Sequence, residues 1–310
     1  MLINPLLGNL KMSSTVTKPI YPILFAVSFA HLLNDLVQGV IPAVYPLLKE
    51  QHHLNYAQIG MITLVYQCAA SIFQPVVGSY TDRKPMPYSQ MYGMAFLTVG
   101  LLLFAHAGSY FFILISVFLI GIGSSIFHPE SSRVAYMASS GRRSLAQSIF
   151  QIGGNSGTAL APIIVALIVL PRGQWAIIWM IIVPVVGQFV SYYIGHWYSK
   201  HLKNSATSVK KVLRIPDLSN KKITLSVTVL LLLILSKYFY IASITNYFQF
   251  YTIQKFGISE VEAQIYLFYF LIAVAVGTML GGIFGDRFGR KYVIWFSVLG
   301  VAPFALALPY

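Results

Sequence analysis

The chain has 310 residues, of which 57% are hydrophobic and only 9% are charged, and its formal net charge is +13. A soluble globular domain carries about a quarter charged residues, so a soluble fold of this length is excluded. The apolar residues form runs of roughly 20, the length of a helix that crosses a bilayer while satisfying its own backbone hydrogen bonds. Strands of a membrane barrel would be shorter and would alternate in polarity. We therefore predict an all-α, polytopic membrane protein.

Eight apolar runs and part of a ninth follow one another along the chain. They cover about 21–48, 57–79, 89–107, 110–137, 144–170, 175–198, 223–253, 260–284 and 292–310. The polar segment between the sixth and seventh runs divides the chain into a six-span N-terminal bundle (1–198), a cytoplasmic linker (199–222) and the start of a truncated C-terminal bundle (223–310). Because the chain ends inside an apolar run, we expect it to be either a fragment of a longer protein or the product of a truncated gene.

Basic residues are concentrated in the N-terminal tail, the linker and every second loop, whereas the opposite loops hold only Lys49, Arg172 and Lys255. Lys and Arg beside membrane spans stay on the cytoplasmic side, so we expect a cytoplasmic N-terminus. Residues 1–20 lack the apolar core and small-residue cleavage site of a signal peptide. The positive charge is explained by this topology, and no nucleic-acid partner is expected.

Enzyme and metal signatures are missing from the sequence. The only cysteine is Cys68, inside the second run, which excludes an intramolecular disulfide and a cysteine-based metal site and suggests a packing role. No H-E-x-x-H, G-x-S-x-G or phosphate-loop motif occurs. We therefore predict a protein that is not an enzyme and has no cofactor or metal.

Ionisable residues inside spans are rare and usually face a cavity or a partner, so each is a candidate for function. Asp35 lies near the middle of the first span, with His31 and Gln38 on the same helical face and Asn34 beside them. A carboxyl group removed from water favours its neutral form, and so can bind and release protons. The alternative is a hydrogen-bonded contact between helices.

The fourth span contains His128, Pro129, Glu130 and Arg133. Glu130 and Arg133 are three residues apart and can pair on one helical face, while Pro129 removes a backbone hydrogen bond and bends the helix. A bent helix beside an ion pair suits a gate or a coupling element, with His128 and Arg133 tuning Glu130. A static buried pair is the alternative.

Polar side chains recur at helical spacing in other spans. The candidates for the cavity are Gln67 and Gln74 in the second span, Gln151 and Asn155 in the fifth, and Lys237 and Tyr240 in the seventh. An unsatisfied amide facing lipid would cost several kcal/mol, so these stripes should face the protein interior. Hydrogen bonds between helices, a partner for Lys237 elsewhere, or an interfacial aromatic belt that includes Tyr240 explain them as well as substrate contacts do.

The signature Gly-x-x-x-Asp-Arg ends two of the runs, 204 positions apart, and indicates two halves of one architecture. The copies consist of Gly78, Asp82 and Arg83, and of Gly282, Asp286 and Arg287, the second followed by Arg290. We interpret them as a gating motif.

The chain resembles the major facilitator superfamily, and more narrowly its fosmidomycin resistance branch of bacterial drug exporters. The resemblance is carried by 31–35 (HLLND), Gln74-Pro75 with Thr81-Asp82-Arg83, 127–135 (FHPESSRVA), 146–151 (AQSIFQ) and Gly153-Gly154-Asn155. It implies a twelve-span fold with two halves around a central cavity, alternating access, and proton-coupled export of small organic molecules across the bacterial inner membrane. It also implies that Asp82 and Asp286 latch the halves together on the cytoplasmic side.

From these observations we predict a monomeric secondary transporter whose partners are the lipid bilayer, protons and a small organic substrate. Asp35 and Glu130 are the candidates for proton handling. A proton-coupled importer of a small metabolite and a non-transporting remnant remain as alternatives, and the sequence does not identify the substrate.

Overall fold

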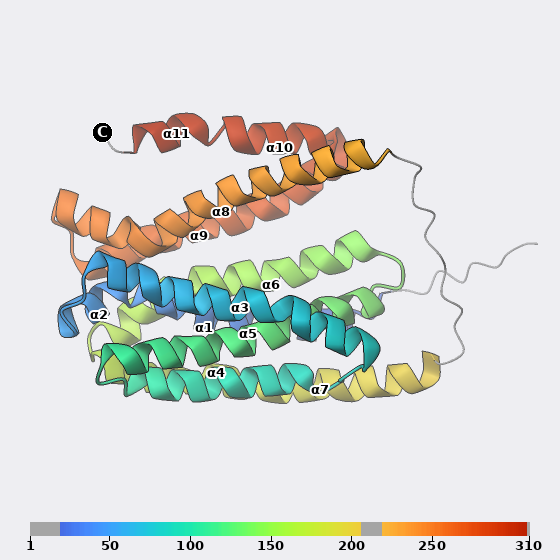
Figure 1. Cartoon of the computed structure of the whole chain (residues 1–310), viewed down its shortest axis with the longest axis horizontal. Coiled ribbons are helices and arrows are strands. Elements are labelled where there is room, and N and C mark those ends of the chain that lie inside the picture. The colour runs from blue at the N-terminus through green and yellow to red at the C-terminus, as the bar shows by residue number, and fades with distance from the viewer. Residues whose placement is uncertain (1–18, 206–218, 309–310) are drawn as a thin grey trace, which may run out of the picture.

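The computed structural model describes residues 19–205 and 219–308, together forming the all-α architecture in Figure 1. Eight helical positions within these ranges (144, 204, 205, 220, 282, 283, 286 and 290) are described by their backbone alone. Seven of the described helical segments are long and apolar enough to cross a membrane, and two shorter apolar ones accompany them. The predicted fold class is therefore confirmed.

The helices fall into two groups along the chain. The first group contains α1 (Tyr21–Ala43), α2 (Tyr45–Gln51), α3 (Tyr56–Arg83), α4 (Ser89–Ala105), α5 (Tyr110–Ala138), α6 (Arg143–Ile164), the π-helical turn η1 (Val165–Val169), the 3-10 helix η2 (Gln174–Ile181) and α7 (Ile182–Ser205). The second group contains α8 (Asn220–Phe256), α9 (Glu260–Phe288), α10 (Arg290–Leu299) and α11 (Ala302–Ala307).

The helix ends differ from the expected ones at two places. The first span stops at Ala43, where Pro42 and Pro46 interrupt backbone hydrogen bonding, and the short helix α2 follows. The linker expected over 199–222 is helical at both ends, because α7 continues to Ser205 and α8 begins at Asn220. The rest of that linker lies outside the described residues.

Small residues bring α1 and α6 close together. A Cβ atom at Gly153 would lie 2.0 Å from the carbonyl oxygen of Ser28, and one at Gly157 would lie 2.1 Å from that of Leu32. Only glycine allows this backbone-to-backbone approach. The packing fixes α6 against the face of α1 that carries the polar residues of the candidate site.

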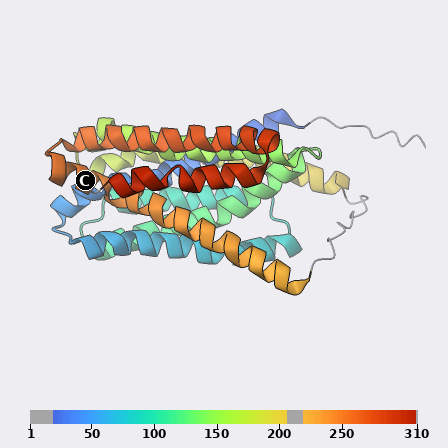
Figure 2. The same cartoon turned by 90° about the horizontal axis from the view of Figure 1, so that it is seen from above.

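The two groups of helices meet at one end and lie further apart at the other (Figure 1). The end that contains α2 and the turn between α8 and α9 is called the turn end. The opposite end, where α7 finishes and α8 begins, is called the linker end. In the view from above, α8 crosses the other helices obliquely (Figure 2). Along the remaining contact, α9 packs against α6, where Ala159, Leu267 and Leu271 form a small buried cluster.

Candidate functional site

A cavity of about 1100 Å³ lies between the two groups of helices. Residues of α1, α2, α3, α5 and α6 form its wall on one side, and residues of α8 and α9 form it on the other. Nine of the predicted site residues line it: His31, Asp35, Gln38, Gln67, Gln74, His128, Gln151, Asn155 and Lys237. The structure therefore collects side chains from five helices at one place.

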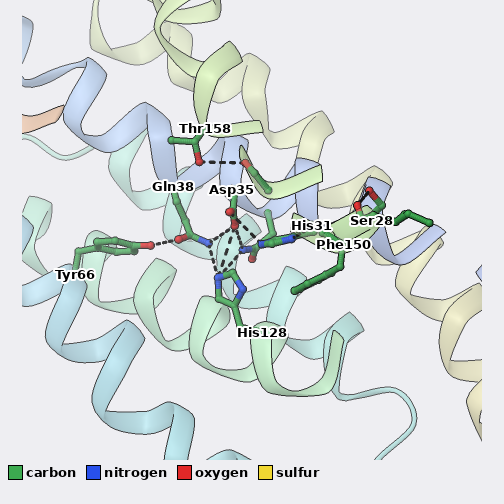
Figure 3. A network of polar contacts seen from close by, with 11 residues as sticks. Ser28, His31, Asp35, Gln38, Tyr66, His128, Phe150 and Thr158 are labelled. Carbon is green, nitrogen blue, oxygen red and sulfur yellow. Dashed lines mark hydrogen bonds and ion pairs between the residues drawn. The ribbon is translucent and has the colours of Figure 1, made fainter. Parts of the chain in front are cut away.

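Asp35 lies between two histidines in this wall (Figure 3). Nε2 of His31, one turn earlier on α1, is 3.1 Å from Oδ2 of Asp35, and Nε2 of His128 on α5 is 3.7 Å from Oδ1. The amide nitrogens of Asn34 and Gln38 donate to Oδ1 at 2.9 and 3.2 Å. The carboxyl group is thus held by groups from two helices while its side chain keeps 18% of its surface exposed.

The orientation of the His31 ring determines where its hydrogen lies. Nδ1 is 2.8 Å from the backbone carbonyl oxygen of Phe150 on α6, and the two rings stack with centroids 3.9 Å apart. A carbonyl oxygen only accepts, so Nδ1 must donate. A neutral ring then presents the bare lone pair of Nε2 to Asp35. A hydrogen bond at 3.1 Å between Nε2 and Oδ2 therefore requires one further proton, carried by the ring or by the carboxyl group.

Among the described residues, His31, Asp35 and His128 form a group that could hold a metal ion by its geometry. Each side chain offers one ligand atom, and these atoms lie within 4.8 Å of one another. Direct contacts already use these atoms: His31 Nε2 faces Asp35, and His128 Nε2 lies 3.4 Å from the amide nitrogens of both Asn34 and Gln38. Hydrogen bonding accounts for the arrangement, and we assign no metal to it.

Amide and hydroxyl groups extend the cluster into α3. The hydroxyl of Tyr66 donates to Oε1 of Gln38, which orients the Gln38 amide nitrogen toward Asp35 and His128 (Figure 3). Asn34 is fully buried behind the cavity wall, so it supports Asp35 and does not line the cavity.

The predicted relation between His128 and Glu130 is wrong. His128 points to Asp35, whereas Oε1 of the fully buried Glu130 lies 2.9 Å from Nη1 of Arg133. Residues two apart on a helix are rotated by about 200° and so face opposite sides. Arg133 also lies 2.5 Å from Oδ1 of Asp82 at the end of α3. Glu130 and Arg133 therefore belong to a second cluster, separate from the one around Asp35.

The first copy of the gating motif lies at the linker end, where α3 stops. The carbonyl oxygen of Gly78 accepts a 3.4 Å hydrogen bond from Arg133, while Arg83 is exposed. The second copy occupies the matching place at the end of α9, where Arg287 is exposed. Gly282, Asp286 and Arg290 of this copy are described by their backbone alone.

Of the residues predicted on α8, Lys237 lines the cavity and Tyr240 does not. Tyr238, a neighbour of Lys237, takes the place expected for Tyr240. Tyr238 and Tyr240 are two residues apart, so the same 200° rotation separates their faces. Cys68, for which the sequence suggests a packing role, is exposed on α3.

Two buried glutamines at the turn end were not predicted. Gln264 of α9 donates to the carbonyl oxygen of Ala43 at 2.6 Å and to Oε1 of Gln249 at 2.7 Å, and Gln249 of α8 donates to the carbonyl oxygen of Pro42 at 3.3 Å. They cap the end of α1, whose last carbonyl groups have no partner within the helix. Their sequence signal was present, since both are amides inside apolar runs.

Comparison with known proteins identifies the family. A profile of the Major Facilitator Superfamily matches residues 27–310. The chain belongs to this superfamily. Members of it move small molecules across membranes, so this protein is a transporter and not an enzyme, as the sequence predicted.

Within the superfamily, the chain is 51% identical over 298 residues to the fosmidomycin resistance protein of Escherichia coli (strain K12), covering 96% of this chain and 73% of that protein. It is 42% identical over 303 residues to the uncharacterized MFS-type transporter YfnC of Bacillus subtilis (strain 168), covering 96% and 74%. The predicted fosmidomycin resistance branch is thereby confirmed.

Among solved structures, the fold is similar to that of a bacterial homologue of the human lysosomal transporter spinster in an inward-facing, unoccupied conformation. The TM-score is 0.68 at 16% sequence identity, and the alignment covers 87% of this chain. The chain spans 63% of that protein's length.

Proposed function

We propose that this protein is a proton-coupled exporter of small organic molecules in the bacterial inner membrane, with its N-terminus in the cytoplasm. The observation that carries the proposal is the contact between His31 and Asp35 in the wall of the cavity. It requires a proton, and it borders the space in which a substrate would bind. The pair is therefore our candidate for the site that binds and releases the coupling proton.

Loss of that proton would change the sign of the contact. With the proton present, Nε2 of His31 and Oδ2 of Asp35 attract each other across 3.1 Å. Without it, a lone pair faces a carboxylate, and the two groups repel. Since His31 is also tied to the Phe150 carbonyl oxygen of α6, this repulsion acts between α1 and α6. On this proposal, protonation is coupled to a movement of the helices around the cavity.

The energy available is sufficient for export. One proton that moves down a force of about 150 mV supplies roughly 3.5 kcal/mol, which sustains a substrate gradient of about 300-fold. One titrating pair in the cavity is enough for this purpose. As substrate we propose fosmidomycin, since the similar protein of Escherichia coli is a fosmidomycin resistance protein.

The conformation fits a state open to the cytoplasm. Hydrogen bonds join α8 and α9 to α1 and α3 at the turn end, as between Asn246 and Thr63 at 3.0 Å, whereas the helix groups lie further apart at the linker end (Figure 1). The similar spinster homologue is also inward-facing. On this proposal, a substrate enters from the linker end, and release requires the turn-end hydrogen bonds to break.

Everted membrane vesicles test the proposal. The protein, expressed from its own gene in an efflux-deficient host, should accumulate radiolabelled fosmidomycin inside everted vesicles when respiration acidifies their interior, and a protonophore should abolish the accumulation. Accumulation in right-side-out vesicles whose interior is made alkaline by respiration would indicate a proton-coupled importer instead. Absence of gradient-driven movement in both orientations would refute the proposal.

A further inference from the structure

We propose that a zinc ion added from outside binds to His31, Asp35 and His128 and thereby inhibits the protein. The hydrogen bonds described above satisfy these side chains in the working protein, which needs no resident metal. The inference is that zinc competes with those hydrogen bonds. Binding of zinc depends on the geometry of the cluster alone, whereas its effect on transport rests on the proposed function.

Two nitrogen lone pairs lie beside one carboxyl group. Nδ1 of His31 donates to a backbone carbonyl oxygen, so Nε2 of the neutral ring presents its lone pair to Asp35. Nε2 of His128 lies 3.4 Å from two side-chain amide nitrogens, which only donate, so it presents a lone pair as well. Neutral imidazole nitrogens and a carboxylate oxygen are among the ligand atoms that zinc prefers.

The distances between these atoms fit a tetrahedral zinc site. Zinc binds histidine nitrogen and carboxylate oxygen at about 2.0–2.2 Å, which places neighbouring ligand atoms of a tetrahedron about 3.4 Å apart. The carboxylate oxygens of Asp35 lie 3.1 Å from Nε2 of His31 and 3.7 Å from Nε2 of His128. The two histidine nitrogens lie within 4.8 Å of each other, so a small rotation of the His128 side chain, which is 24% exposed, completes the site.

The groups around the cluster also match those around a zinc site. A zinc-bound histidine usually donates its other ring hydrogen to a carbonyl oxygen or carboxylate, and a zinc-bound carboxylate accepts further hydrogen bonds. Nδ1 of His31 donates to the carbonyl oxygen of Phe150 at 2.8 Å. Oδ1 of Asp35 accepts from Asn34 and Gln38 at 2.9 and 3.2 Å. These hydrogen bonds would hold two of the three ligands in place.

The cavity provides access and the fourth ligand. All three side chains line the cavity of about 1100 Å³, so water can complete the coordination of a bound zinc ion. Calcium takes six to eight oxygen ligands, and magnesium requires octahedral coordination by oxygen. The cluster offers two nitrogens and one carboxylate. We therefore expect zinc to bind and magnesium and calcium not to bind.

Zinc and the shared proton exclude each other. The hydrogen bond between His31 and Asp35 places one proton between Nε2 and Oδ2, whereas a zinc ion needs the lone pair of Nε2 and an oxygen of the carboxylate. Binding forms two zinc–nitrogen bonds and one zinc–oxygen bond, the ion loses water ligands, and the proton leaves to solvent. On the proposed function, the protein then lacks the group that carries the coupling proton.

Calorimetric titration of the purified chain in detergent, freed of any affinity tag, tests the binding. Zinc chloride should bind once per chain at this site, and magnesium chloride should give no binding heat. His128→Asn should weaken zinc binding at least tenfold, because even loss of a partner outside the ligand shell costs about 10–100-fold. His106→Asn is the matched control and should bind zinc like the unchanged protein, since the exposed His106 ring bonds only to the carbonyl oxygen of Leu102 among the described residues.

X-ray absorption at the zinc edge identifies the ligands without any variant, and we expect two imidazole rings. Fewer than two rings, or equal zinc affinities of His128→Asn and His106→Asn, would overturn the proposed site.

Transport in reconstituted liposomes tests the inhibition. Zinc should stop the accumulation of fosmidomycin driven by an imposed pH gradient, and half-inhibition should require at least tenfold more zinc in His128→Asn than in His106→Asn. Accumulation that continues while zinc saturates the site would overturn the inhibition. If zinc binds as expected but no proton-driven transport occurs even without zinc, the zinc site is supported and the proposed function is refuted.

Discussion

Gly154 is the position where the smallest change should disturb the proposed proton site. A Cβ atom there would lie 2.4 Å from Cε1 and 2.5 Å from Nε2 of His31, and 2.6 Å from Oδ2 of Asp35. Ordinary carbon contacts begin near 3.5 Å, so Gly154→Ala must displace the two groups by about 1 Å. The new methyl group would enter the space where Nε2 and Oδ2 share their proton.

The size of the effect follows from this geometry. Displacement by about 1 Å breaks the 3.1 Å contact between His31 and Asp35, a hydrogen bond to a charged group worth roughly 1.5–3 kcal/mol. Overpacking adds a cost of about 1–3 kcal/mol to folding, which the better helix propensity of alanine offsets by about 1 kcal/mol. We expect a protein that still inserts in the membrane and whose proton-driven fosmidomycin transport falls at least tenfold.

The assay is the initial rate of gradient-driven uptake into everted vesicles, normalised to the amount of protein in the membrane. Gly277→Ala on α9 is the matched control, because its added Cβ meets nothing within 4 Å. It should transport like the unchanged protein. If Gly154→Ala is folded and transports as fast as this control, the shared proton between His31 and Asp35 is not the coupling site.

Three further substitutions test other parts of the structure. Glu130→Gln should lower the free energy of unfolding by about 1–3 kcal/mol, measured by denaturant titration in detergent, because Arg133 loses one of its two acidic partners and keeps Asp82. Gln264→Leu removes the donor to the end of α1 and should shift the equilibrium by about 1–3 kcal/mol toward a wider turn end, seen as longer distances between spin labels on α2 and on the α8–α9 turn. Tyr238→Phe should alter the affinity for substrate and Tyr240→Phe should not, since only Tyr238 lines the cavity; equal effects in ligand titrations would contradict the assignment.

Much of the fold could be predicted from composition, because a bilayer permits few architectures. Runs of apolar residues predict the helices, and the repeated Gly-x-x-x-Asp-Arg signature marks equivalent ends of α3 and α9. The break after Ala43 was missed, since Pro42 and Pro46 interrupt a run that is apolar throughout. Prolines within apolar runs are therefore better treated as possible helix ends.

The sequence predicts those contacts of the candidate site that lie within a single helix. His31, Asp35 and Gln38 share one helical face, and the structure places them together. The partner of the His31 ring could not be inferred, because the Phe150 carbonyl oxygen lies 119 positions away and backbone groups leave no trace in residue type. The sequence pattern pairs His128 with the nearby Glu130, whereas packing of α5 against α1 brings His128 to Asp35.

The most direct measurement of the central claim compares two activities of Asp35→Asn in reconstituted liposomes. Exchange of labelled for unlabelled fosmidomycin requires the conformational cycle without net proton movement, whereas uphill accumulation requires the proton. We expect the variant to keep exchange close to that of the unchanged protein and to lose accumulation driven by an imposed pH gradient. Accumulation that persists in Asp35→Asn at the unchanged level would contradict proton coupling at His31 and Asp35.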